Sequence, residues 1–211
     1  MRVALTMVHL LVADRWAEEH PAYSTSPEYY LGAVSPDAIH IRDKDDKSRK
    51  DFFHLHNWQS PHPDEVIEYW RENHSPFDIG YGIHVLTDCQ WVPRYKELLP
   101  GILKPDGRLN TDIYYTDTFI TDFRICREVP RIAGIMDMLE AAKAPYDHPL
   151  LTHDEFDAWR RLIVEMYRGE CPKQGKVTFI DMDYVVAFAN DCLALMNQTY
   201  DAYRNNTELS Q

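Results

Sequence analysis

Residues 80–91 constrain the fold more than any other stretch of the chain. The segment is hydrophobic nearly all round, which is typical of a helix buried in the middle of a domain. His84 and Asp88 interrupt it at positions i and i+4, so their side chains leave the same face of the helix one turn apart. An ionised carboxylate in such a helix is costly unless a counter-charge or a hydrogen bond stabilises it.

Two interpretations of this pair follow from its chemistry. A divalent metal takes neutral imidazole and carboxylate as ligands, and would remove the cost of burying Asp88. The alternative is a buried hydrogen bond between His84 and Asp88 that ties two helices together. The remainder of the sequence decides between them.

The composition predicts an all-α protein. The chain has 211 residues, 45% of them hydrophobic and 27% charged, which is the profile of one globular domain spanning residues 1–211. Only 8 glycines stand against 13 tyrosines, 8 phenylalanines and 5 tryptophans, so a helical, aromatic-rich core is favoured over a turn-rich β-sandwich. We expect a compact multi-helix bundle.

The charge and the cysteines limit the partners. A formal net charge of −12 disfavours binding to duplex nucleic acid or to anionic membranes. The apolar run near the N-terminus lacks a clear cleavage site and is too short to span a bilayer, so it predicts a core helix. The four cysteines are scattered without a CxxC motif, which is typical of a reducing compartment. We therefore expect a cytoplasmic protein without membrane insertion.

Further candidate ligands precede the central segment. His9 lies beside the apolar face of a helix expected over residues 4–19, where a lone histidine is usually a satisfied core residue. Pro36 favours a helix start, which places Asp37 where an anion is stabilised, so capping is its alternative role. The charged run at residues 42–51 is predicted to be a solvated loop.

His54 and His56 are separated by one residue among aromatic neighbours. In an extended segment the two side chains would share a face, because strand side chains alternate. Such a pair indicates a metal site only in combination with other ligands.

Two acids lie in a helix expected over residues 112–123. Asp122 stands among Phe119, Ile120 and Phe123, an unusual setting for a carboxylate on a solvated face, whereas Asp117 is expected to be a surface acid. Farther along, Thr152 and Glu155 form a capping box that predicts the start of another helix.

Four ordered motifs carry a family resemblance. They occupy residues 30–40, with the Pro-Asp pair at Asp37, residues 53–54, residues 80–88 and residues 114–123. In this order they closely resemble the bacterial zinc-dependent phospholipase C-like family, and they extend to about residue 130. The C-terminal third adds only helical character.

The resemblance implies an all-α fold around a di- or trinuclear metal centre that hydrolyses phosphate esters. Downstream, His148 and His153 are five apart and do not form the His-x-x-x-Glu of those enzymes, so a smaller site, similar to that of HD-type phosphohydrolases, is expected. The ligands that it implies are His9, Asp37, His54, His84 and Asp88. His56 is the alternate to His54, and Asp122 would complete the smaller site. Either Asp37 or Asp122 would bridge metals or act as the base.

The expected cofactor is a divalent metal, with zinc as the first choice and manganese, nickel or iron as alternatives. The expected function is hydrolysis of a small, soluble phosphate ester by a metal-dependent phosphodiesterase or phospholipase C-like enzyme. The alternative is a non-catalytic metal-binding or structural protein that keeps the fold. Metal content and phosphodiester turnover separate the two.

Overall fold

The computed structural model describes residues 5–42, 50–56, 62–98 and 100–208. Within these ranges the chain is helical and contains no β-strand beyond an isolated antiparallel bridge between Leu103 and Leu109. The predicted all-α class is confirmed.

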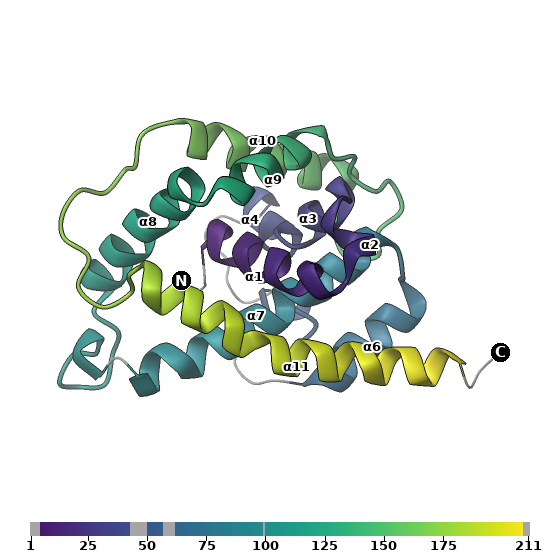
Figure 1. Cartoon of the computed structure of the whole chain (residues 1–211), viewed down its shortest axis with the longest axis horizontal. Coiled ribbons are helices and arrows are strands. Elements are labelled where there is room, and N and C mark those ends of the chain that lie inside the picture. The colour runs from purple at the N-terminus through teal and green to yellow at the C-terminus, as the bar shows by residue number, and fades with distance from the viewer. Residues whose placement is uncertain (1–4, 43–49, 57–61, 99, 209–211) are drawn as a thin grey trace.

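The longer helices carry most of the structure (Figure 1). They are α1 (Thr6–Glu19), α6 (Pro63–Glu72), α7 (Pro76–Leu98), α8 (Thr111–Glu128), α9 (Pro130–Ala141), α10 (His153–Arg168) and α11 (Met182–Glu208). Shorter segments connect them: α2 (Pro21–Ser24), α3 (Pro27–Gly32), η1 (Ser35–Ala38), α4 (Ile39–Arg42), α5 (Lys50–Phe53) and η2 (Pro100–Ile102). The capping box predicted at Thr152 and Glu155 is present and begins α10.

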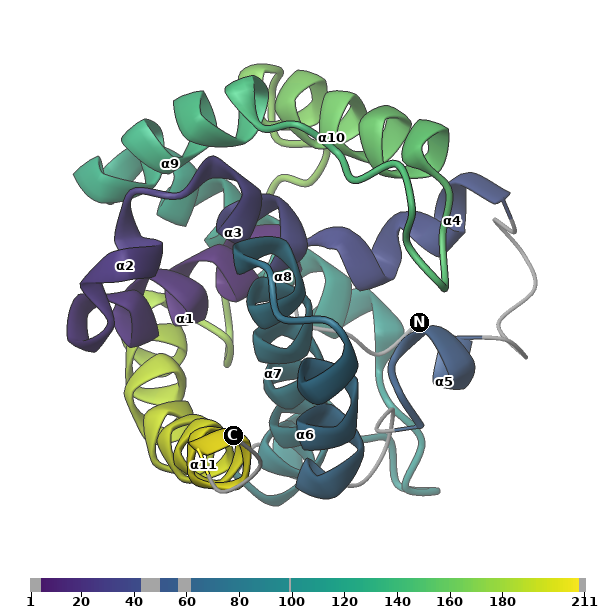
Figure 2. The same ribbon diagram turned by 90° about the vertical axis from the view of Figure 1, so that its right-hand side faces the viewer.

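Helix α7 is the element around which the others pack. Residues 77–89 are all buried, as its continuous hydrophobic sequence predicts. It contacts α1, α3, α6 and α11. Figure 2 shows α9 and α10 on one side of the molecule and α11 on the opposite side, with α1 and α3 between them.

Two glycines allow α3 and α7 to approach closely. A Cβ atom on Gly80 would lie 2.0 Å from the carbonyl oxygen of Tyr29, and one on Gly32 would lie 1.9 Å from that of Phe77. Only glycine fits at such backbone contacts. The crossing places the end of α3 against the first half of α7, one turn before His84.

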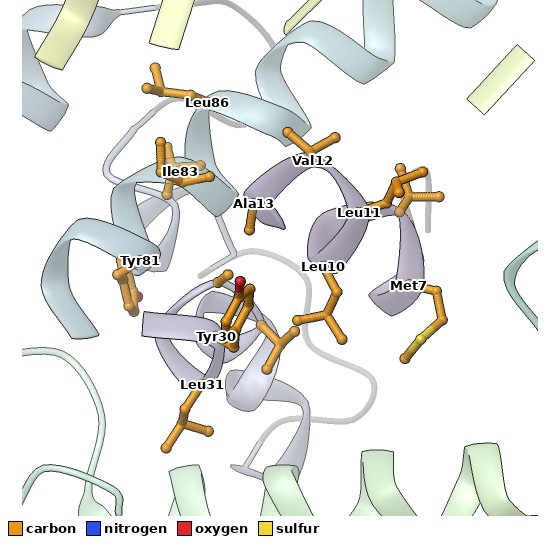
Figure 3. Close-up of a cluster of buried hydrophobic side chains, with 14 of the residues drawn as sticks. Met7, Leu10, Leu11, Val12, Ala13, Tyr30, Leu31, Tyr81, Ile83 and Leu86 are labelled. Carbon is orange, nitrogen blue, oxygen red and sulfur yellow. The ribbon is translucent and has the colours of Figure 1, made fainter. Parts of the chain in front are cut away.

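The core is built from the same helices. Figure 3 shows side chains of α1, α3 and α7 gathered together, among them Leu10, Leu31 and Ile83. The buried hydrophobic residues form one cluster that extends from Met7 to Tyr200. Among the described residues, none of the helices combines the length and the apolar character that crossing a bilayer requires.

The charged run differs from its prediction at Lys50. Residues 43–49, for which a solvated loop is predicted, lie outside the described residues. Lys50 begins α5, and only 2% of it is exposed. The prediction of a solvated segment is therefore wrong at this residue, because a local run of charges does not reveal a partner elsewhere in the chain.

Candidate metal centre

Four buried side chains converge in the middle of the bundle. Asp37 comes from η1, His54 follows α5, and His84 and Asp88 lie one turn apart on α7. Each offers one ligand atom, and these four atoms lie within 4.8 Å of one another. The structure thus brings together residues that are separated by up to 51 positions in the chain.

Main-chain carbonyl groups fix the orientation of both histidines. The Nδ1 of His54 lies 2.9 Å from the carbonyl oxygen of Lys50, and the Nδ1 of His84 lies 2.9 Å from that of Ala33. A carbonyl oxygen only accepts hydrogen bonds, so Nδ1 is the donor in each ring and the neutral ring carries its lone pair on Nε2. Both Nε2 atoms face the carboxylates, an arrangement common to metal-binding histidines.

The local backbone explains why His54 joins the group and His56 does not. Leu55 and His56 adopt positive φ angles of 51° and 56°, so a left-handed turn follows α5. The predicted extended segment with both histidines on one face is wrong. The His56 side chain is 59% exposed and lies 3.2 Å from Asp51.

Asp88 is the most deeply buried acid of the group, with 1% of its side chain exposed. Its Oδ2 lies 3.3 Å from the Nε2 of His54 and 3.8 Å from that of His84, and its Oδ1 lies 3.4 Å from the Nε2 of His9. Among the described residues, neither oxygen has a hydrogen-bond partner of good geometry. A buried carboxylate in this condition is costly without a cation beside it.

His9 lies at the edge of the group. Its ring stacks on that of His84, with centroids 3.7 Å apart and an angle of 6° between the planes. Neither ring nitrogen has a hydrogen-bond partner of good geometry within the described part of the chain. His9 faces the Oδ1 atom of Asp88, whereas His54 and His84 face the Oδ2 atom.

The protonation states suit metal binding. Burial would raise the pKa of Asp37, but Lys50 and the nearby histidines hold it well below its usual range. Burial likewise opposes ionisation of Asp88, and the imidazoles of His54 and His9 hold its pKa well below normal. Burial, reinforced by His9, lowers the pKa of His84 well below its usual value. Ionised carboxylates and a neutral imidazole are the forms that bind metals.

Asp37 is the most exposed member of the group, at 8%. Its Oδ1 accepts a hydrogen bond from the Lys50 ammonium at 2.5 Å, and the Nε2 of His40 lies 3.7 Å from the same oxygen. The side chain of His40 is 15% exposed.

The structure places Asp122 outside the group. It is buried, as its aromatic neighbours predict, but its oxygens accept hydrogen bonds from the amides of Met7 and Val8 at 3.1 Å and from the hydroxyl of Tyr167. These amides belong to the first turn of α1, where N–H groups lack the usual carbonyl partner four residues earlier. The Val8 amide also lies 3.0 Å from the carbonyl oxygen of Leu5, just before the helix. Asp122 thus caps α1 from a distant helix.

Asp117 has a similar role. It is 1% exposed and accepts hydrogen bonds from the amides of Thr178, Phe179 and Ile180, at 2.9, 2.6 and 3.1 Å. The prediction of a surface acid is wrong, because the donors come from a segment 61 to 63 residues later in the chain.

The two later histidines belong to other networks. The Nε2 of His148 lies 2.8 Å from the hydroxyl of Tyr69, and that hydroxyl donates to Asp78 at 2.9 Å. The Nδ1 of His153 lies 3.1 Å from the carbonyl oxygen of Ala144. His148 also lines a cavity of about 610 Å³ formed with residues 72–73 and 146–152, to which none of the four converging residues contributes.

The donor set fits a divalent metal. Two imidazoles and two carboxylates, without a thiolate, match the ligands of zinc and of other first-row divalent ions.

Lys50 is a residue of this region that was not predicted from the sequence. Its only signal was its position four residues before His54, which is not specific. No family model, curated protein or solved structure matches the chain.

Proposed function

We propose that the chain is a metal-dependent hydrolase of phosphate esters, of the phospholipase C-like type that its motifs resemble. The observation that supports this proposal is the convergence of Asp37, His54, His84 and Asp88 in a buried space. The unsatisfied oxygens of Asp88 call for a cation, and zinc is the first choice for this donor set. The scattered cysteines favour the cytoplasm as the location within this proposal.

The residues have separate tasks in the proposed reaction. A divalent metal supplies Lewis-acid activation of water and neutralises charge on the phosphoryl group. The Nδ1 atoms of His54 and His84 donate to main-chain carbonyl groups, which leaves the Nε2 of each ring as the atom that would bind the metal. Asp37, the most exposed ligand, is our candidate for orienting the attacking water. Asp122 has no such task, since its oxygens hold the first turn of α1.

A turnover assay tests the proposal. Metal-stripped protein is reloaded with zinc, manganese or nickel and given bis(4-nitrophenyl) phosphate or 4-nitrophenyl phosphate. We expect turnover with at least one metal, and we expect His84→Ala and Asp88→Ala each to lower kcat/KM by about 100-fold or more. His56→Ala, at an exposed histidine outside the group, is the matched control and should retain activity.

The two candidate functions give different results in this assay. A metal-filled site without turnover on either ester supports the non-catalytic metal-binding protein. Full activity in His84→Ala or Asp88→Ala contradicts the proposed site, whatever the substrate.

A further inference from the structure

Lys50 is a buried cation in contact with two members of the metal-binding group. Only 2% of Lys50 is exposed, and its Nζ lies 2.5 Å from the Oδ1 of Asp37. Its carbonyl oxygen accepts the hydrogen bond from the Nδ1 of His54. Burying an ammonium group is expensive unless it is paired, so its contact with Asp37 is an integral part of the centre.

The ammonium group of Lys50 lies beside the Oδ1 atom of Asp37. The Oδ1 atom faces Lys50, His40 and His54, whereas the Oδ2 atom faces the Nε2 of His84 at 4.0 Å. In two-metal sites a shared carboxylate holds the ions about 3.5–4 Å apart. Beside Asp37, the Lys50 ammonium lies 2.5 Å from Oδ1 and would strongly repel a second cation at this depth.

Within the described part of the chain, the remaining donors do not complete a second site beyond Asp88. On the far side of Asp88, His9 approaches Oδ1 at 3.4 Å. Asp122 is held by the first turn of α1 and by Tyr167. Among the described residues, a second ion there would have His9 and Asp88 as its donors, fewer than the three protein ligands of a typical catalytic zinc site.

We infer that Lys50 is a permanent second cation of the centre, and that the chain binds a single divalent metal ion. One divalent ion and one ammonium together outweigh the charges of Asp37 and Asp88, which favours an anionic ligand. The part of this inference that concerns the substrate rests on the proposed function: a phosphate ester is met by one metal ion and one lysine instead of two metal ions.

Calorimetric titration of the metal-stripped full chain with Zn²⁺ alone tests the inference. Wild-type protein should bind one ion per chain. Lys50→Met removes the charge but keeps much of the side-chain volume, and should bind Zn²⁺ more tightly by about tenfold or more, because the repulsion of the ion is lost. Lys104→Met removes an exposed lysine and is the matched control, with no expected change in affinity.

The outcomes are distinct. Two or more high-affinity ions per wild-type chain overturn the inference and leave the proposed function intact. Weaker Zn²⁺ binding by a folded Lys50→Met variant also overturns it, because Lys50 would then be only a scaffold for Asp37 and His54. Absence of Zn²⁺ binding by wild-type protein overturns both the inference and the proposed function. The wild-type stoichiometry decides the question even where the variant fails to fold.

Discussion

Buried carboxylates in this protein differ in the donors that face them. Asp117 and Asp122 accept hydrogen bonds from backbone amides, so each is satisfied by the polypeptide itself. Asp37 and Asp88 face imidazole nitrogens and the Lys50 ammonium instead. All four are acids on helical segments, but their roles differ. Asp122 caps α1 and Asp117 holds residues 178–180, whereas Asp37 and Asp88 are candidate metal ligands.

Asp122 gives a prediction about pH. Burial raises its pKa to about 7, although the hydroxyl of Tyr167 and the amides of Met7 and Val8 oppose the shift. Because this value lies above the ordinary pKa of about 3.9, the folded protein binds the proton more tightly than the unfolded chain does. The stability from this group is present at about pH 4 and is lost as the pH rises through 7.

Asp122→Asn should remove this pH dependence. As the pH rises from 5 to 7, the wild-type free energy of unfolding should fall relative to that of the variant, by up to about 1.4 kcal/mol per pH unit. Urea denaturation at several pH values measures the difference. Parallel stability curves for the two proteins would show that Asp122 does not titrate in this range.

The residues of the candidate centre were predictable to different degrees. The i,i+4 spacing places His84 and Asp88 on one helix face without further information. His54 was separable from His56 only through the left-handed turn that begins at Leu55, which the sequence does not reveal. Lys50 was hidden in a charged run because its partner, Asp37, lies 13 residues earlier in the chain.

At the scale of elements, the crossing of α3 and α7 positions the candidate centre. Gly32 and Gly80 bring the two backbones together, and the carbonyl oxygen of Ala33 at the end of α3 accepts the hydrogen bond from His84. The helices themselves follow from hydrophobic periodicity and capping residues. The crossing does not, because it depends on which glycine meets which backbone atom.

Gly80→Ala should weaken this crossing. The added methyl group would lie 2.0 Å from the carbonyl oxygen of Tyr29, so the backbones must separate. We expect a loss of about 1–3 kcal/mol in the free energy of unfolding. Gly134→Ala in α9 is the control: its Cβ meets nothing within 4 Å, and the better helix propensity of alanine should stabilise the protein by about 0.5–1 kcal/mol.

Chemical denaturation of both glycine variants measures these changes. A Gly80→Ala variant as stable as Gly134→Ala would contradict the close backbone contact between α3 and α7. A metal affinity reduced together with stability in Gly80→Ala, but not in Gly134→Ala, would support the dependence of His84 on this crossing.

At the scale of the whole molecule, the candidate centre joins segments far apart in the chain. It includes Asp37 from η1, His54 from the turn that follows α5, and Asp88 from α7, with His9 of α1 beside them. A metal bound there would link these segments, and its removal would leave Asp37 and Asp88 close together in the interior.

Chelation should therefore lower the melting temperature. With free metal at about 100 times Kd, binding adds about 2.7 kcal/mol of stability, equivalent to about 5–10 °C for a chain of this size. Differential scanning calorimetry of metal-loaded protein, with and without chelator, measures the shift. Melting temperatures that agree within a degree, in protein shown to hold metal, would indicate an ion bound at the surface instead.

Anomalous scattering at the zinc absorption edge, from crystals of the zinc-loaded protein, tests the central claim most directly. The account predicts one strong peak per chain within about 2.0–2.2 Å of the Nε2 atoms of His54 and His84 and of carboxylate oxygens of Asp37 and Asp88. A peak bound only by surface residues, or none among these four side chains in protein with a full equivalent of zinc, would contradict it.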